Sequence, residues 1–231
     1  MQPNDKVLLL LHRGPEVVIA MLACNLLGAV FVPLDVEWPT TRIQSIIAQS
    51  GAGVTLINKS FFRTSELSTH NIVLDTEELL QNCDVNFANQ QLATLEQSKQ
   101  NLWPTAYLLF TSGTTGEPKG VQVSQAALNS RLNWIIEHWG LTSDDRSLQA
   151  TQINFDPALI ELLSPLIVGG SVAFPEPGRL LPETLPSIIN HFNATMMAFV
   201  PSTLTRFLDG LDSQIELPLR ICCCGGEVLS Y

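Results

Sequence analysis

The repeated alternation of short apolar runs with longer segments of helical length constrains this chain's fold more than any other feature. Residues 7–11 form an apolar run of strand length, and residues 15–27 follow with Pro15 first and Gly28 just beyond, as expected of a helix. The same alternation continues, with expected strands at 30–34, 54–57, 72–74, 106–111, 121–123, 147–150, 171–174, 196–200 and 219–224, and expected helices at 40–50, 125–140, 157–168, 185–192 and 203–211. Strands separated by helices predict an α/β fold with parallel or mixed β-sheets flanked by helices.

A polar stretch at 81–101, rich in asparagine and glutamine, divides this alternation into two parts. Such a composition favours a connection on the surface rather than a buried element. We therefore expect residues 1–231 to form part of one large domain with approximate halves at 1–100 and 101–231.

Composition excludes several classes of protein. The chain carries a formal net charge of −10 and no basic run, so it would repel a phosphate backbone and is not expected to bind nucleic acid. No stretch approaches the roughly 18 uninterrupted apolar residues of a membrane helix, and the polar start is no signal peptide. The five cysteines include three in a row and show no C-x-x-C spacing, so neither a disulfide framework nor a metal site is predicted. A cytoplasmic protein without a membrane partner is expected.

The sharpest motif is the segment 111–120, Thr-Ser-Gly-Thr-Thr-Gly-Glu-Pro-Lys-Gly. Its glycines allow backbone conformations closed to other residues. Its backbone N–H groups, its hydroxyls and Lys119 together can form a cradle for phosphate. It is not the P-loop of nucleoside triphosphatases, because Pro118 precedes the lysine and Gly120 stands where that motif has serine or threonine. On composition alone, an ordinary solvated turn is the alternative.

This segment, with residues 107–110 before it, resembles the phosphate-loop signature of the adenylate-forming (AMP-binding) superfamily. That superfamily includes acyl-CoA synthetases, luciferases and the amino-acid adenylation domains of non-ribosomal peptide synthetases. The resemblance implies a mobile loop that holds the β- and γ-phosphates of ATP, with Lys119 as a catalytic residue that contacts the leaving pyrophosphate. The implied phosphate-binding residues are Thr111, Ser112, Gly113, Thr114, Thr115, Gly116 and Lys119.

Three further stretches, in the same order along the chain, resemble the amino-acid adenylation branch of that superfamily. Residues 25–35 are similar to a structural segment of that branch, and 154–156 with Glu161 resemble its aspartate-containing motif. Residues 219–229 resemble the strand and loop that line the acyl pocket and approach the adenine. The resemblance covers nearly the whole chain, and it is closest to a truncated adenylation domain of a non-ribosomal peptide synthetase.

Asp156 distinguishes the branches, because the resemblance implies that it binds the α-ammonium group of an amino acid. A carboxylate buried at a pocket mouth needs such a cation to offset its desolvation. The alternative is that Asp156 caps the helix that begins at Pro157, and both roles can hold together. Ala158 occupies the position of a customary serine, which weakens expectations about the hydrogen bonds of this loop.

The resemblance also implies a substrate pocket, although only part of it can be assigned. Its substrate-binding residues would be Asp156, Ile160, Phe199 and Cys223, and its adenine and acyl pocket would include Gly225, Gly226 and Glu227. The alternative for Phe199 and Cys223 is that they fill the core between strands.

The implied function is ATP-dependent activation of an amino acid as its adenylate, for transfer to the phosphopantetheine thiol of a carrier (thiolation) domain. The Mg²⁺ ligand, the ribose-binding aspartate and a small C-terminal subdomain with a second lysine are expected to lie beyond this chain. We therefore expect a fragment of a large N-terminal domain that is inactive alone and binds nucleotide weakly at most. A fragment of an acyl-CoA or aryl-acid ligase and a non-catalytic remnant are the alternatives.

Overall fold

The protein folds as two compact units, Met1–Asn129 and Ser130–Tyr231, in a computed structural model. The structure describes residues 1–58, 67, 69–74, 78, 81, 105–112, 118–176, 178, 180–212 and 214–228. The division lies later in the chain than the polar stretch at 81–101, most of which falls outside the described residues. It lies later because the strands that follow this stretch complete the sheet that the first 74 residues begin.

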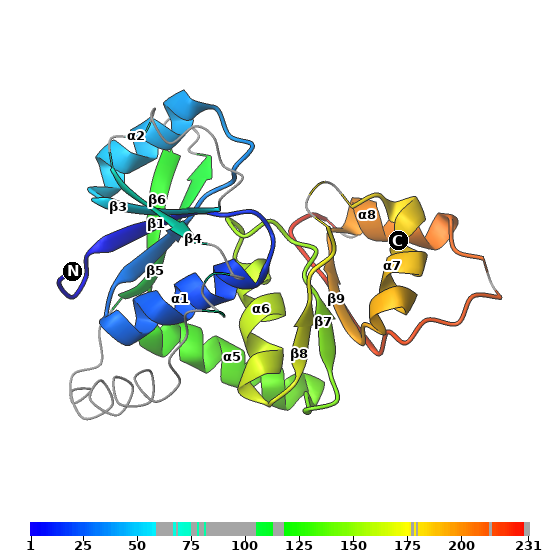
Figure 1. The fold of residues 1–231 in the computed structure, drawn as a ribbon. Helices are drawn as coiled ribbons and strands as arrows, with labels where there is room; N and C mark the ends of the chain where they lie inside the picture. Colours follow the sequence, from blue (N-terminus) through cyan, green and yellow to red (C-terminus); the bar gives the residue numbers. More distant parts are fainter. Residues whose placement is uncertain are drawn as a thin grey trace. The chain divides into compact units, whose positions relative to one another are not determined.

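The first unit is built on a six-stranded sheet with the order β4-β3-β1-β2-β5-β6. Its strands are β1 (Lys6–Leu10), β2 (Val30–Pro33), β3 (Val54–Asn58), β4 (His70–Leu74), β5 (Thr105–Ser112) and β6 (Pro118–Ser124). All neighbouring strands are parallel except β5 and β6, which pair antiparallel, so this sheet is mixed. Helices α1 (Pro15–Leu27) and α2 (Thr40–Ser50) cover opposite faces of the sheet (Figure 1).

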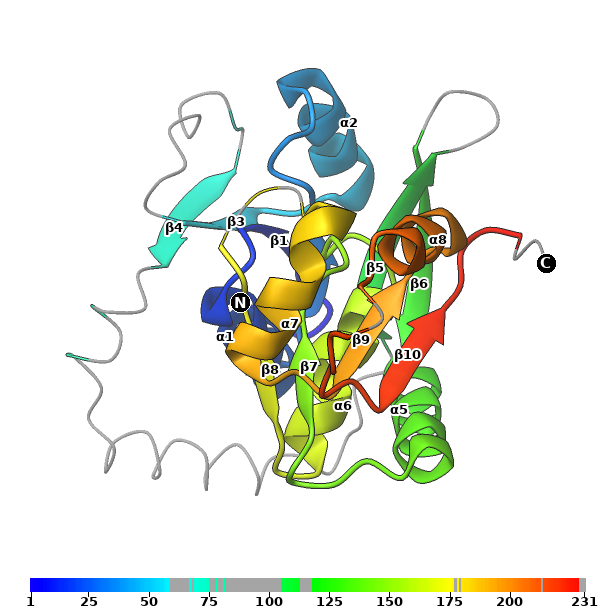
Figure 2. The same cartoon turned by 90° about the vertical axis from the view of Figure 1, so that its right-hand side faces the viewer.

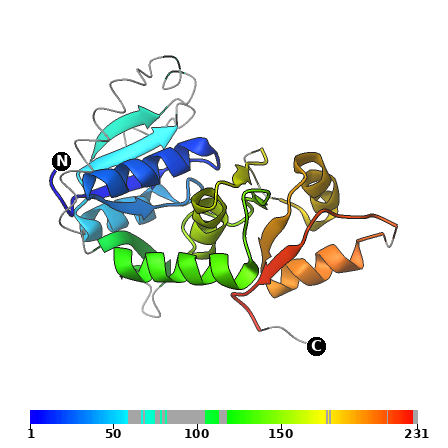
Figure 3. The ribbon, with the colours of Figure 1, turned by 90° about the horizontal axis from the view of Figure 1, so that it is seen from below.

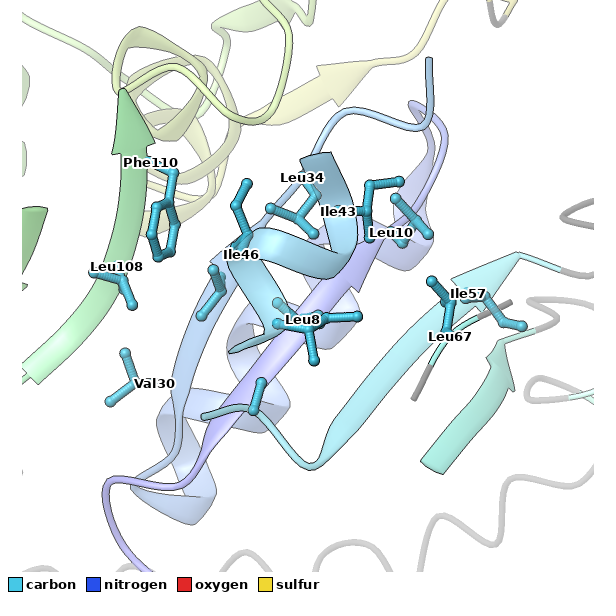
Figure 4. Close-up of a cluster of buried hydrophobic side chains, with 13 residues drawn as sticks. Leu8, Leu10, Val30, Leu34, Ile43, Ile46, Ile57, Leu67, Leu108 and Phe110 are labelled. Atoms are coloured by element: carbon cyan, nitrogen blue, oxygen red, sulfur yellow. The ribbon is translucent and has the colours of Figure 1, made fainter. Parts of the chain in front are cut away.

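The helix ends and the apolar face predicted from the sequence are confirmed in this unit. Gly28 and Gly51 stand directly after α1 and α2 with φ values of 70° and 67°. This left-handed conformation is available to glycine without the steric cost that a Cβ brings. The buried isoleucines of α2 lie against Leu8, Leu10 and Leu34 of the sheet face (Figure 4).

The second unit is built on a four-stranded parallel sheet with the order β10-β9-β7-β8. Its strands are β7 (Arg146–Leu148), β8 (Ser171–Ala173), β9 (Met196–Phe199) and β10 (Ile221–Cys224), and its helices include α6 (Pro157–Ile167), α7 (Leu185–Phe192) and α8 (Pro201–Asp209), with a short 3₁₀ turn, η2 (Pro182–Thr184). Helices α6 and α5 (Gln125–Trp139) lie on one face of this sheet, and α7 and α8 lie on the other (Figures 2 and 3). The unit is therefore a parallel sheet covered on both faces.

Helix α5 begins with the serine cap that the sequence predicts. The Ala127 backbone N–H donates to the Ser124 hydroxyl over 3.1 Å, which satisfies one of the amide groups that a helix start leaves without a partner. We expect Ser124→Ala to lower the free energy of unfolding by about 1 kcal/mol, and Ser124→Asn to keep most of it. Urea unfolding checks both, and equal stability of wild type and Ser124→Ala would contradict the cap.

Within the described ranges, no helix is both long enough and apolar enough to cross a bilayer. Those ranges also contain no group of three or more histidine, cysteine, aspartate or glutamate side chains placed to hold a metal ion.

Candidate functional site

The order of strands in the second unit marks one position at the edge of its sheet. From β7 the chain passes through α6 to β8, and from β9 it passes through α8 to β10 on the other side. The connections that leave these two adjacent strands therefore diverge, and their helices lie on opposite faces. Open parallel sheets bind ligands outside the carboxyl ends of their strands at such a switch point. Residues 149–156, after β7, and Val200, after β9, occupy this position.

Asp156 ends the loop 149–156, which joins β7 to α6, and its side chain is exposed. Its backbone already has helical angles, with φ of −59° and ψ of −31°, and its side chain makes no capping hydrogen bond. The capping role that the sequence left open is therefore wrong, because a capping side chain turns back over the helix from an extended backbone. Exposure also removes the expectation of a buried carboxylate that needs a cation to offset its desolvation.

Glu161 is the fifth residue of α6, and its side chain is completely buried. Its carboxylate accepts hydrogen bonds from the Ala150 N–H over 3.1 Å, the Thr151 N–H over 2.9 Å and the Thr151 hydroxyl over 3.0 Å. Burial raises the pKa of Glu161 to about 7, while these bonds and one from the Ala198 backbone N–H oppose the shift. The sequence identifies Glu161 only as part of the aspartate-containing motif and assigns it no role. The signal that could have singled it out is a lone carboxylate among the apolar residues of α6.

Two other sequence-predicted pocket residues lie in the core of the second unit. Ile160 is buried in a cluster with Ile135 and Met196. Phe199 is buried on the opposite face, where its ring centroid lies 5.2 Å from that of Phe207. These placements favour the core role that the sequence left open for Phe199, and they place Ile160 in apolar packing rather than at an open surface.

Cys223 lies half-buried in β10 on the sheet face that carries α5 and α6. Burial is the first cause that raises the pKa of its thiol, followed by the charge of Cys224, and the charge of Glu161 acts in the same direction. Of the four substrate-binding residues expected from the sequence, only Asp156 has an exposed side chain.

The segment 225–227 is tied to the start of α8. Gly225 donates its backbone N–H to the Phe199 carbonyl over 3.1 Å, and Gly226 has a φ of 92° that favours glycine. The Glu227 carboxylate accepts hydrogen bonds from the Ser202 N–H over 3.0 Å and from the Ser202 hydroxyl over 3.1 Å. Its side chain therefore caps α8 rather than pointing at an open pocket. No motif in the sequence indicates this pairing across 25 residues.

In the first unit, the ends of the phosphate-loop segment lie side by side on an antiparallel hairpin. Thr111 pairs with Lys119 and Ser112 with Pro118, and the Thr111 hydroxyl donates to the Lys119 carbonyl over 3.5 Å. Paired residues of neighbouring strands point to the same face, so the exposed side chains of Thr111 and Lys119 share one face. Gly113, Thr114, Thr115 and Gly116, to which the resemblance assigns phosphate contacts, lie outside the described residues.

Gly120 has a packing role in this hairpin that the sequence did not indicate. A Cβ added to Gly120 would stand 3.0 Å from Leu108 Cδ1 and 3.3 Å from the ring of Phe110. Phe110, which pairs with Gly120 across the hairpin, belongs to the core beneath α2 (Figure 4). The last glycine of the motif therefore leaves room for buried side chains.

Comparison with known proteins identifies the family of this chain. The profile of the AMP-binding enzyme family matches residues 1–231. Tyrocidine synthase 3 of Brevibacillus parabrevis is 30% identical over 229 residues. Two solved structures are similar over 99% of this chain, each at 26% identity. One is the o-succinylbenzoate-CoA synthetase of Bacillus subtilis with its acyl-adenylate intermediate, with a TM-score of 0.78. The other is a four-domain nonribosomal peptide synthetase bound to AMP and glycine, with a TM-score of 0.81.

The chain spans only part of each of these proteins. It corresponds to 3% of the length of tyrocidine synthase 3, 57% of the o-succinylbenzoate-CoA synthetase chain and 16% of the four-domain synthetase chain. The match to the family nevertheless extends over the whole sequence, including both units and the hairpin that carries Lys119. The chain belongs to the AMP-binding enzyme family.

Proposed function

We propose that this chain provides the ATP phosphate-binding hairpin and the amino-acid-binding loop of an enzyme that activates an amino acid as its adenylate. The observation that carries the proposal is the position of Asp156. Its exposed carboxylate stands at the switch point of the second sheet, where ligands bind in open parallel folds, and it makes no capping bond with its own helix. A carboxylate in such a place is suited to an ammonium group.

In the proposed reaction, a carboxylate oxygen of the amino acid attacks the α-phosphorus of ATP. A bond forms between that oxygen and the α-phosphorus, which gives the acyl-adenylate. The bond between the α-phosphorus and the pyrophosphate oxygen breaks at the same time. Negative charge grows on the departing pyrophosphate. Hydrogen-bond donors and cations that contact this charge lower the activation free energy. We assign that task to the hydroxyls and backbone N–H groups of 111–116 and to Lys119.

The relatives support an amino acid as the substrate. The four-domain nonribosomal peptide synthetase was solved with AMP and glycine, which are the two halves of an aminoacyl-adenylate. By analogy, we propose that a carrier-domain phosphopantetheine thiol receives the activated amino acid and that ATP is used with Mg²⁺. No residue of this chain is proposed as a ligand of that ion, since the described part of the chain has no suitable cluster.

A second candidate function is activation of a carboxylic acid without an α-amine, as in an acyl-CoA or aryl-acid ligase. The observation that favours it is the similarity to the o-succinylbenzoate-CoA synthetase, whose substrate carries no ammonium group. The two candidates share the phosphate hairpin and differ in what Asp156 contacts. A non-catalytic remnant is a third possibility, and it predicts no activation of any acid.

Pyrophosphate exchange into ATP separates these candidates. The assay uses a completed protein, in which residues 1–231 are joined to the remainder of an adenylation domain. Each amino acid is tested beside its des-amino analogue, which has the same carboxylate and side chain and lacks the ammonium. We expect exchange with at least one amino acid and none with its analogue. Exchange with the analogues alone would support the ligase, and exchange with no acid would support the remnant.

A further inference from the structure

Glu161 holds the chain at the carboxyl end of β7, beside the switch point. Its carboxylate accepts hydrogen bonds from the N–H groups of Ala150 and Thr151, just after β7. The Thr151 hydroxyl adds a further donor. One buried carboxylate of α6 thus fixes the start of the loop 149–156.

A carboxylate at this position is costly unless these donors are present. The adjacent inward residues of α6 include Ala158, Leu159 and Leu162, and each is almost completely buried. Burying a charge among apolar side chains without partners costs several kcal/mol. An apolar residue at 161 would avoid that cost, but it would leave the Ala150 and Thr151 N–H groups without this acceptor. The buried carboxylate therefore lowers the stability of the core and, through its hydrogen bonds, holds the loop in one conformation.

We propose that Glu161 is a positioning residue that anchors the loop 149–156 and thereby holds Asp156 in place for the substrate's ammonium group. This inference rests on the proposed function. Loop residues between the anchor and Asp156 support the same role. Phe155 donates its N–H to the Gln152 carbonyl over 3.0 Å, and Gln149 donates its side-chain N–H to the Thr151 carbonyl. The loop is thus bonded internally and fixed at its base.

Protonation of Glu161 should be coupled to this anchor. A protonated carboxyl keeps one oxygen as the acceptor for the two loop N–H groups and can donate to the Thr151 hydroxyl, and it no longer buries a charge. The charges of Arg131 of α5 and of Glu161 shift the pKa of Cys223 of β10 in opposite directions. Burial raises the pKa of Glu161 to about 7, above that of an exposed glutamate. The closed loop therefore binds the proton more tightly than an open loop that exposes Glu161, and it is expected to be held less tightly as the pH rises through about 7.

Hydrogen exchange of the 231-residue chain tests the anchor without any catalytic activity. In Glu161→Gln at about pH 8, we expect the amides of 150–156 to exchange about tenfold faster or more than in wild type. Residues 196–199 of β9 should change less. Glu137→Gln, which removes an exposed carboxylate from α5, is the matched control and should match wild type. Unchanged exchange of 150–156 in Glu161→Gln would overturn the proposal.

The wild-type chain provides a second test that needs no variant. After correction for the intrinsic pH dependence of exchange, protection of 150–156 should rise from about pH 8 to pH 6, because the closed loop, in which burial raises the pKa of Glu161 to about 7, binds the proton more tightly than an open loop. Constant protection across this range would contradict an anchor made by the carboxylate, even if Glu161→Gln did not fold.

The completed protein then links the anchor to the substrate. We expect Glu161→Gln to raise the KM for the amino acid about tenfold and to leave the KM for ATP within about twofold. An equal rise in both KM values, or none, would refute the link to Asp156. Faster loop exchange in a completed protein that activates no acid would instead show that the anchor exists and the proposed function is wrong.

Discussion

Replacing Asp156 by alanine is expected to lower kcat/KM for the amino acid in the completed protein by about 100-fold or more. Removal of one partner from a buried, hydrogen-bonded charge pair costs about 2–5 kcal/mol, because the remaining charge loses its counter-ion, and we expect the bound amino acid to cover the Asp156 carboxylate. The exposed carboxylate of Asp156 makes no capping bond with α6, so its loss should leave the helix start intact. The pyrophosphate-exchange assay measures this change, with the KM for ATP expected to stay near its wild-type value.

Asp144→Ala is the matched control for this prediction. Asp144 is also an exposed aspartate of the second unit, but it stands before β7, at the opposite end of that strand from the loop 149–156. Its replacement should leave activation unchanged. Full activity of Asp156→Ala with an amino acid, or an equal loss in Asp144→Ala, would remove the basis for an ammonium site at Asp156.

Asp145→Ala is expected to destabilise the second unit by about 3 kcal/mol. Asp145 is 2% exposed and accepts hydrogen bonds from the Thr142 N–H over 2.8 Å, the Thr195 hydroxyl over 2.8 Å and Arg220 Nε over 2.9 Å. Arg220 also donates to the carbonyls of residues 139 and 140, so the network joins the end of α5 to the starts of β7, β9 and β10. Urea unfolding measures the loss.

Acid unfolding gives this network a second signature. Burial opposes ionisation of Asp145, but bonds from Arg220, Thr142 and Thr195, with the charge of Arg220, lower its pKa to about 2. Because the folded state holds the proton less tightly than the unfolded state, stability from this group is present above about pH 4 and lost towards pH 2. Asp145→Asn should flatten the unfolding free energy over that range and Asp144→Asn should not. Parallel pH profiles for wild type and Asp145→Asn would contradict the network.

Much of the fold could be predicted from the sequence because its signals are local. Pro15 and Gly28 mark the ends of α1, and the isoleucines of α2 share one face because their spacing matches the helical period. The order of strands could not be read in this way. That β2 pairs with β5, across 71 residues of intervening sequence, depends on the assembled sheet and not on any run of residues. The extent of the first unit, Met1–Asn129, depends on this pairing as well.

The candidate site was predictable where a motif marks it and not where long-range hydrogen bonds define it. The sequence identified Asp156 and Lys119 as residues of interest, and their roles in binding stay predictions. The sequence did not predict that Ile160 lies in an apolar cluster. It also did not predict that Glu227 accepts a hydrogen bond from Ser202 at the start of α8. The anchor at Glu161 joins α6 to the start of the loop before it through hydrogen bonds that no motif indicates. A cytoplasmic location also stays a prediction.

We propose that this one chain carries both a binding site for the ATP phosphates and a binding site for an amino acid's ammonium group. The most direct test is amino-acid-dependent pyrophosphate exchange by the completed protein, compared with Lys119→Ala and with Lys6→Ala, a lysine at the start of β1. We predict exchange that requires an amino acid, falls about 100-fold or more in Lys119→Ala and is unchanged in Lys6→Ala. Exchange that persists in Lys119→Ala, or that never depends on an amino acid, would contradict the account.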